Sequence, residues 1–142
     1  MTRDDRRKTL GVVGILAALV PAVALSHGNI APQPVDTTGL APLGEAWLET
    51  NPYRGQKLAV EIGHHAYNMQ CARCHGLEAI SGGLAPDLRS LDKGDDGDKE
   101  FLPPVRHGVY RDGRALMPKY EGIVSQEAMW AIRSWLETVH ED

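Results

Sequence analysis

Cysteine is scarce in this chain of 142 residues, which contains only Cys71 and Cys74. A zinc site built on cysteines would need two further ligands, and no other cysteine supplies them. The sequence also lacks an internal repeat, a basic cluster outside its N-terminal end, and an alternating apolar pattern long enough to predict a strand. Nucleic acid is therefore not an expected partner, and the length suits one domain with additional segments.

The N-terminal end has the three-part pattern of a secretory signal peptide. Basic residues within Arg3–Lys8 are followed by Leu10–Leu25, a run without a charge, and small residues then lead up to a cleavage site after Ser26. We predict a signal peptide over residues 1–26 and export to the periplasm.

Retention of this segment as a membrane anchor is the alternative, and it would make the protein a tethered subunit of a larger complex. A spanning helix needs about 20 apolar residues, whereas this run is shorter and is interrupted by Pro21. Cleavage removes more basic than acidic residues, so the exported chain is more acidic than the formal net charge of −4 indicates.

Two helices are predicted in the exported part. Apolar residues recur at spacings of three and four over Gln56–Gln70. A second helix begins after Ser125, a favourable N-cap, and carries an apolar stripe as far as Val139. Glycine and proline interrupt the sequence between them, so loops and at most short helices are expected there. The sequence therefore predicts an all-α, loop-rich fold.

The chain divides into three predicted parts: the signal peptide, an irregular extension over residues 27–54 rich in proline and glycine, and a domain over residues 55–142. The extension is expected to lie across the domain surface, with a short helix around Leu43–Glu49. Within the domain, Asp92–Glu100 resembles a calcium-binding loop in composition but departs from the EF-hand pattern. It is predicted to be a solvated acidic loop.

The sequence Cys71-Ala72-Arg73-Cys74-His75 is a C-x-x-C-H motif, the pattern to which haem c is attached. The two thiols lie one helical turn apart and reach vinyl groups on neighbouring pyrrole rings, and His75 is then placed to bind the iron. A disulfide and a thioredoxin-like redox site are the alternatives, but the latter expects a preceding strand, whereas a helix precedes this pair. We predict one haem c, bound covalently through Cys71 and Cys74.

Haem iron in electron carriers usually takes a second protein ligand, and methionine opposite histidine raises the reduction potential. Met117 is the predicted ligand because it lies far enough beyond His75 for the chain to wrap the haem edge, and Pro118 fixes the loop on one side of it. His107 is the second candidate. Met129 belongs to the predicted C-terminal helix and is expected to pack there.

The segment from about Gly55 to Val139 resembles the class I single-haem cytochromes c. Members of that family have a glycine and an aromatic residue in the helix before the motif, and these fall on Gly63 and Tyr67. An aromatic residue of the C-terminal helix crosses at that glycine, and Trp135 matches it. The resemblance implies a small cytochrome c-like helical fold around one covalently bound haem.

The same resemblance assigns roles around the iron. A proline after the motif accepts the ring N–H of the ligand histidine through its carbonyl, and Pro86 matches it. Such a hydrogen bond fixes the ring and its basicity. The methionine–proline pair of the family falls on Met117 and Pro118, so His75 and Met117 are the implied iron ligands.

Three further segments resemble a narrower group, the PedF-type periplasmic cytochromes. They are His27–Gln33, Glu49–Gly55 and Cys71–Gly83. This resemblance implies that the protein accepts electrons from a quinoprotein alcohol dehydrogenase that uses pyrroloquinoline quinone, and that it passes them to a later cytochrome or a terminal oxidase.

The remaining expectations concern the haem surroundings. Three arginines, Arg89, Arg106 and Arg111, are candidates for holding the haem propionates. Apolar residues expected around the ring are Leu77, Ile80, Leu84, Leu88, Leu91, Leu116 and Ile123. An acidic, monomeric electron carrier would favour partners with a positive patch. The rival function is a haem enzyme or gas-binding protein whose sixth iron position is open.

Overall fold

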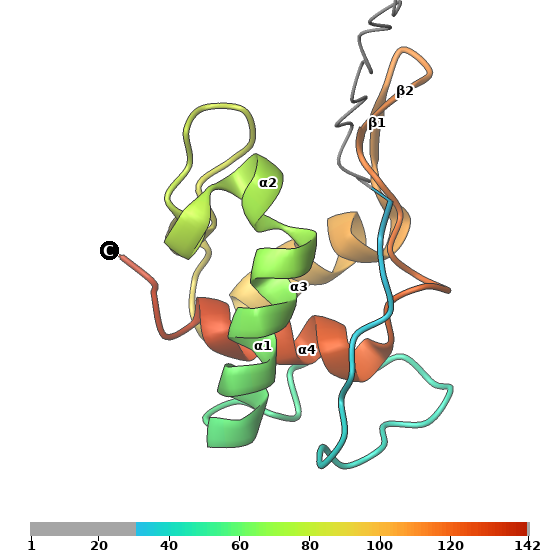
Figure 1. Cartoon of the computed structure of the whole chain (residues 1–142), viewed down its shortest axis with the longest axis vertical. Helices are drawn as coiled ribbons and strands as arrows, with labels where there is room; N and C mark the ends of the chain where they lie inside the picture. The colour runs from blue at the N-terminus through green and yellow to red at the C-terminus, as the bar shows by residue number, and fades with distance from the viewer. Residues whose placement is uncertain (1–30, 142) are drawn as a thin grey trace, which may run out of the picture.

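The computed structural model describes residues 31–141 (Figure 1). The helices of this range are α1 (Lys57–Gln70), α2 (Ala72–His75), α3 (Gly94–His107) and α4 (Gln126–Leu136). Two 3₁₀ turns, η1 (Leu77–Ala79) and η2 (Leu88–Ser90), precede α3, and an antiparallel hairpin of β1 (Val109–Arg111) and β2 (Arg114–Met117) precedes α4. The mostly helical fold confirms the all-α prediction and adds a hairpin that the sequence analysis did not expect.

Helices α1 and α4 cross in close contact at Gly63 (Figure 1). A Cβ atom on Gly63 would lie 1.9 Å from the carbonyl oxygen of Ala131, so only glycine allows this approach. Trp135 packs against α1 beside this crossing: its ring lies 4.5 Å from the ring of Tyr67 and 5.0 Å from that of His64, between centroids. The glycine and the two aromatic residues identified from the sequence therefore meet at one helix crossing.

Helix α4 is buried on nearly every side, which a single apolar stripe does not predict. Ser125 caps its N-terminus as expected, accepting a hydrogen bond from the Ala128 amide at 3.2 Å. The extension covers the face that α1 leaves open. The Leu48 amide donates to Gln126 Oε1 at 2.7 Å, and the Leu43 amide donates to Glu127 Oε1 at 2.9 Å. Residues 31–54 thus form a strap across α4.

The expected helix at Leu43–Glu49 does not form; that stretch is irregular. The reason is visible in the strap contacts, because main-chain groups that a helix would use internally are instead bonded to side chains of α4. Gln126 serves two of them, since its Nε2 also donates to the carbonyl of Ala46 at 3.1 Å.

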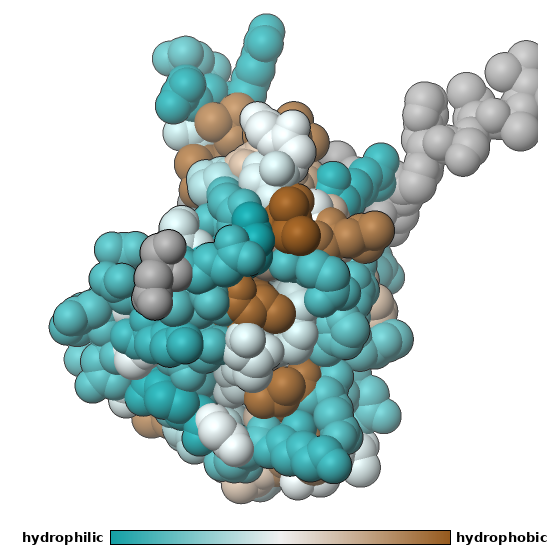
Figure 2. Space-filling model, turned by 90° about the vertical axis from the view of Figure 1, so that its left-hand side faces the viewer, coloured by the Kyte–Doolittle hydropathy of each residue, from teal (hydrophilic) through white to brown (hydrophobic). Residues whose placement is uncertain are grey.

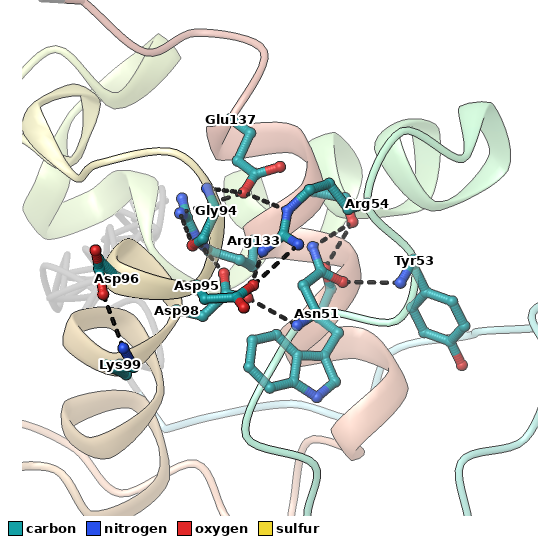
Figure 3. A network of polar contacts seen from close by, with 12 residues as sticks. Asn51, Tyr53, Arg54, Gly94, Asp95, Asp96, Asp98, Lys99, Arg133 and Glu137 are labelled. Carbon is teal, nitrogen blue, oxygen red and sulfur yellow. Dashed lines mark hydrogen bonds and ion pairs between the residues drawn. The ribbon is translucent and has the colours of Figure 1, made fainter.

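Asp92–Glu100 is not the predicted loop, because most of this stretch lies in α3. Its acidic side chains are exposed as predicted, with the exception of Asp98. Asp98 is fully buried and bonded to two guanidinium groups, Arg133 Nε at 2.8 Å and Arg54 Nη2 at 2.6 Å (Figure 3). Gly97 leaves the space that Arg133 occupies, since a Cβ there would lie 2.4 Å from Arg133 Nη2. A carboxylate neutralised in this way is stable inside the protein.

The hairpin connects its strands through Asp112 and Gly113, with φ of 50° and 74°. Two successive positive φ values and an Asp-Gly pair are typical of a tight hairpin turn. The strands are short and every residue of Val109–Leu116 is exposed. The sequence therefore has no alternation of apolar and polar residues there that would predict strands. The hairpin extends away from the helices (Figure 1).

The predicted signal peptide over residues 1–26, and its cleavage after Ser26, fall outside the described residues. Within residues 31–141 no helix is both long enough and apolar enough to cross a membrane.

Candidate haem site

The C-x-x-C-H motif occupies the bend between α1 and α2. Cys71 ends α1, and its carbonyl accepts hydrogen bonds from the amides of Cys74 at 3.1 Å and His75 at 3.0 Å. The two cysteines are therefore one helical turn apart and on one short helix, as their spacing predicts. No disulfide joins them; Cys71 is buried and Cys74 is exposed.

The alternatives to haem attachment are disfavoured by the surroundings of these thiols. Burial, with a smaller contribution from Cys74, raises the pKa of the Cys71 thiol to about 12. Such a thiol is a poor nucleophile at neutral pH, unlike the activated cysteine of a redox enzyme. Within residues 31–141 no group of three or more His, Cys, Asp or Glu side chains is placed to hold a metal ion, which disfavours zinc.

His75 is buried at the end of α2, and its ring is oriented by Pro86. The Nδ1 atom lies 2.8 Å from the carbonyl oxygen of Pro86. Because a carbonyl only accepts, Nδ1 carries the proton and donates it, which leaves the lone pair on Nε2. This is the arrangement typical of a metal-binding histidine, whose second nitrogen is held by a main-chain oxygen. The resemblance indicated this Pro86 contact correctly.

A cluster centred on Asp87 holds the loop that carries Pro86. Asp87 accepts from the Ser81 amide at 3.2 Å and from the Arg89 amide at 3.0 Å, and it is bonded to the Arg89 side chain at 2.9–3.0 Å. The Arg89 side-chain bond, with backbone bonds and charge as smaller contributions, keeps the pKa of Asp87 well below its usual range although desolvation opposes this. Sequence reasoning missed this cluster; an aspartate two residues before an arginine at a turn was the available signal.

The chain immediately after the motif takes a conformation that needs local support. Gly76 has a φ of 85°, and a Cβ atom there would lie 1.8 Å from the carbonyl oxygen of Ile80. Glu78 and Ala79 also have positive φ, at 53° and 61°, which is strained for residues other than glycine. The hydroxyl of Tyr67 donates to the Gly76 carbonyl at 2.7 Å and stabilises this turn. Burial raises the pKa of Tyr67, so its hydroxyl remains a donor.

Met117 ends β2 and is half-buried. Three residues later, the Tyr120 hydroxyl donates to the carbonyl of Gln70, the residue before Cys71, at 2.8 Å. The segment after Met117 is thereby fixed beside the attachment motif. The second candidate, His107, is exposed, and its Nδ1 lies 3.4 Å from Glu121 Oε2. Met129 is fully buried in the core, as expected of a packing residue.

Apolar side chains around the motif and on the hairpin are exposed to an unusual degree. Leu77 is 72% and Leu84 is 77% exposed, and Leu116 is 57% exposed. On the face shown in Figure 2, apolar patches run from the middle of the molecule towards the end that carries the hairpin. Exposed apolar surface of this kind usually marks a binding site. With two cysteine sulfurs and an oriented histidine beside it, the surface fits a flat, largely apolar ring bound covalently here.

Comparison with known proteins gives this site its class. Residues 58–136 match the family described as "Cytochrome C oxidase, cbb3-type, subunit III", which covers more than half of the chain. The chain belongs to the cytochrome c family and carries a covalently bound haem c.

Two curated relatives refine this result. The chain is 56% identical over 133 residues to cytochrome c550 of Pseudomonas aeruginosa, covering 90% of this chain and 92% of the relative. It is 33% identical over 78 residues to the quinohemoprotein alcohol dehydrogenase ADH-IIG of Pseudomonas putida, covering 55% of this chain but 10% of that enzyme. The comparison with solved structures found no match for this chain. The protein is therefore a c-type cytochrome that carries electrons.

Proposed function

We propose that this cytochrome works in the periplasm as a one-electron carrier, not an enzyme, between a quinoprotein alcohol dehydrogenase that uses pyrroloquinoline quinone and a later cytochrome or terminal oxidase. The hydrogen bond of 2.8 Å between His75 Nδ1 and the Pro86 carbonyl carries the carrier part of the proposal. It fixes one tautomer and one ring orientation, so the histidine need not rearrange when the iron changes its charge.

We propose the following ligands for the haem and its iron. Cys71 and Cys74 would hold the haem covalently, His75 and Met117 would bind its iron, and the Pro86 carbonyl holds the His75 ring. When bound, the haem supplies a one-electron couple between ferric and ferrous iron. The chain keeps both ligands in both states, orients His75 and excludes water with apolar side chains.

The electron balance sets the stoichiometry. Oxidation of an alcohol to an aldehyde releases two electrons and two protons, so the dehydrogenase reduces two of these cytochromes in each turnover. The cytochrome takes up one electron from the dehydrogenase and later gives one electron to its acceptor. No bond within the cytochrome forms or breaks.

The dehydrogenase partner is supported by two independent likenesses. The relative ADH-IIG is by name an alcohol dehydrogenase, and one tenth of its length resembles this chain. The extension and the motif segment also resemble the PedF-type cytochromes, including Asn51, Tyr53 and Arg54 of the strap. A signal peptide over residues 1–26 and a monomeric state complete the proposal.

Stopped-flow reduction of the purified holoprotein tests the partner. The oxidised cytochrome is mixed with a quinoprotein alcohol dehydrogenase, with and without its alcohol, and reduction is followed in the visible spectrum. We expect fast reduction only with alcohol present. The rate should fall as ionic strength rises, because salt screens the attraction between the two proteins. If the quinoprotein dehydrogenase reduced the cytochrome no faster than a flavin-dependent dehydrogenase did, this partner would be rejected. The carrier function would remain intact.

A further inference from the structure

The cationic side chains of the described chain fall into two groups. Two of the three arginines expected to hold haem propionates already have carboxylate partners: Arg89 is paired with Asp87 and Glu141, and Arg106 with Glu121. The Arg106 guanidinium also lies 4.1 Å from the ring centroid of Trp47. Both guanidinium groups are therefore already paired with carboxylates within the protein.

Arg111 and Arg114 belong to the other group. They lie directly opposite one another across the hairpin, and both are exposed. Among residues 31–141 neither makes an ion pair with an acidic side chain, including Asp112 in the turn between them. Like charges directly opposite on two strands repel. Two guanidinium groups held this close together favour a carboxylate or a similar anion between them.

The register of the hairpin shows which face carries the two arginines. Val109 is opposite Met117 and Arg111 is opposite Arg114, with Leu116 left unpaired at a bulge. Residues two apart on a strand share a face, and directly opposed residues share a face. Arg111, Arg114 and Met117 therefore lie on one face, with the arginines about 7 Å along the strand from the methionine.

We propose that Arg111 and Arg114 form a carboxylate-binding pair that holds the propionate groups of the haem. The inference rests on the proposed function for its use of Met117 as the iron ligand. The two propionates are the only carboxylates of an otherwise apolar ring, and they lie at one edge of it. The hairpin face has Met117 at its base and the two arginines beside the turn. A haem whose iron is bound by Met117 would fit this face if its propionate edge lay towards the turn.

The pair has two effects in this role. Two nearby guanidinium groups favour the ionised form of both propionates, so these groups stay charged as the iron is oxidised and reduced. The haem edge also neutralises the repulsion between the arginines and stabilises the hairpin, which is too short to be stable alone.

Variants of the holoprotein separate this site from ordinary surface charge. The double variant R111Q/R114Q removes both charges, R111K/R114K keeps the charges without the planar fork, and K119Q is the matched control. Lys119 is an exposed cation two residues beyond Met117, outside the hairpin. The first measurement is the midpoint potential of the isolated protein across the pH range in which histidines and raised carboxyl pKa values titrate. The second is the oxidised-minus-reduced infrared difference spectrum.

We expect the midpoint potential of R111Q/R114Q to fall more steeply with rising pH than the midpoint potential of the wild type. Loss of the arginines raises the propionate pKa into this range, and ferrous iron favours the protonated form. A protonated carboxylic acid band should appear in the infrared difference spectrum. K119Q should show the wild-type dependence of potential on pH. R111K/R114K should show a dependence between that of the wild type and that of R111Q/R114Q.

Two results would overturn the proposal. One is a double variant whose pH profile and infrared spectrum match those of the wild type. The other is a double variant that changes only the rate of electron exchange with a partner and its salt dependence, because the carboxylates would then belong to the partner. The equilibrium measurements need no dehydrogenase, so an incorrect partner in the proposed function leaves this test intact.

Discussion

His75 is oriented by a single main-chain oxygen, that of Pro86, and Pro86 is in turn followed by Asp87, which bonds Ser81 and Arg89. The position of the histidine therefore depends on a carboxylate that never touches it. The C-x-x-C-H pattern and the family resemblance predicted His75 and Pro86. They did not predict Asp87, because hydrogen bonds from a turn aspartate leave no periodic mark in the sequence.

Asp87→Asn is expected to destabilise the oxidised holoprotein at neutral pH. The folded pKa of Asp87 is below its ordinary value, so the carboxylate stabilises the fold above the unfolded pKa and loses this contribution as pH falls towards the folded pKa. The difference in unfolding free energy between wild type and variant should shrink as pH falls from neutral into the range where carboxyl groups are protonated. Denaturant titrations at several pH values measure this difference.

The control for Asp87 is Asp96→Asn. Asp96 pairs with Lys99 at 2.7 Å, but both side chains are largely exposed, and such pairs contribute little. A difference for Asp87→Asn that stays constant with pH would show that hydrogen-bond geometry, not charge, is what the variant removes.

Met117→Ala tests the proposed second ligand. Loss of the thioether should lower the midpoint potential and open the iron to carbon monoxide in the reduced protein. The weak far-red absorption band that marks methionine bound to ferric iron should also disappear. Met69, half-exposed on α1, supplies the control Met69→Ala, which should leave all three readouts unchanged. A Met117→Ala protein with the wild-type spectrum would exclude Met117 and favour His107.

Among the elements, α1 and α4 were the most predictable and α3 the least. The first two bury apolar residues at helical spacing against one another, so hydropathy alone reveals them. Helix α3 buries Asp98 against Arg54 and Arg133 and contains Pro103 and Pro104. The helix is stabilised by ion pairs with segments distant in the sequence. The local sequence pattern therefore does not predict it.

The α1–α4 crossing allows a sharp test at Gly63. Gly63→Val would place its Cβ within the carbonyl of Ala131, so the helices must separate. We expect a loss of about 3 kcal/mol or more in unfolding free energy, at the upper end for overpacking. Gly82→Ala is the matched control, since a Cβ there meets nothing within 4 Å, and it should be nearly neutral in thermal or denaturant unfolding.

At the scale of the whole molecule, the strap over residues 31–54 completes the core that the family domain alone leaves open. Sequence reasoning placed it across the surface, which is correct, but could not tell that it ends in buried contacts. For example, the main-chain amide of Asn51 donates to Asp98 Oδ2 at 2.7 Å (Figure 3). Its side-chain Nδ2 donates to Ser134 Oγ at 2.9 Å.

Gln126→Ala should release the strap without disturbing the haem. The change leaves the Leu48 amide and the Ala46 carbonyl without partners, at a cost of about 1–3 kcal/mol. We expect faster proteolysis within the strap and an unchanged visible spectrum. Gln56→Ala, which removes one exposed hydrogen bond to Pro52, should digest at the wild-type rate; equal rates for both variants would mean that other contacts hold the strap.

Both ends of the described chain return to the segments that carry the haem. Gln33 exchanges two hydrogen bonds with Gln70, next to Cys71, and Glu141 pairs with Arg89 at 2.6 Å beside the Pro86 loop. A label or a linker attached at Gln33 or Glu141 would therefore begin close to the redox centre. For immobilising this cytochrome with its redox surface left open to soluble partners, Lys57 is a better anchor, because its side chain is 92% exposed at the end of α1 away from the attachment motif.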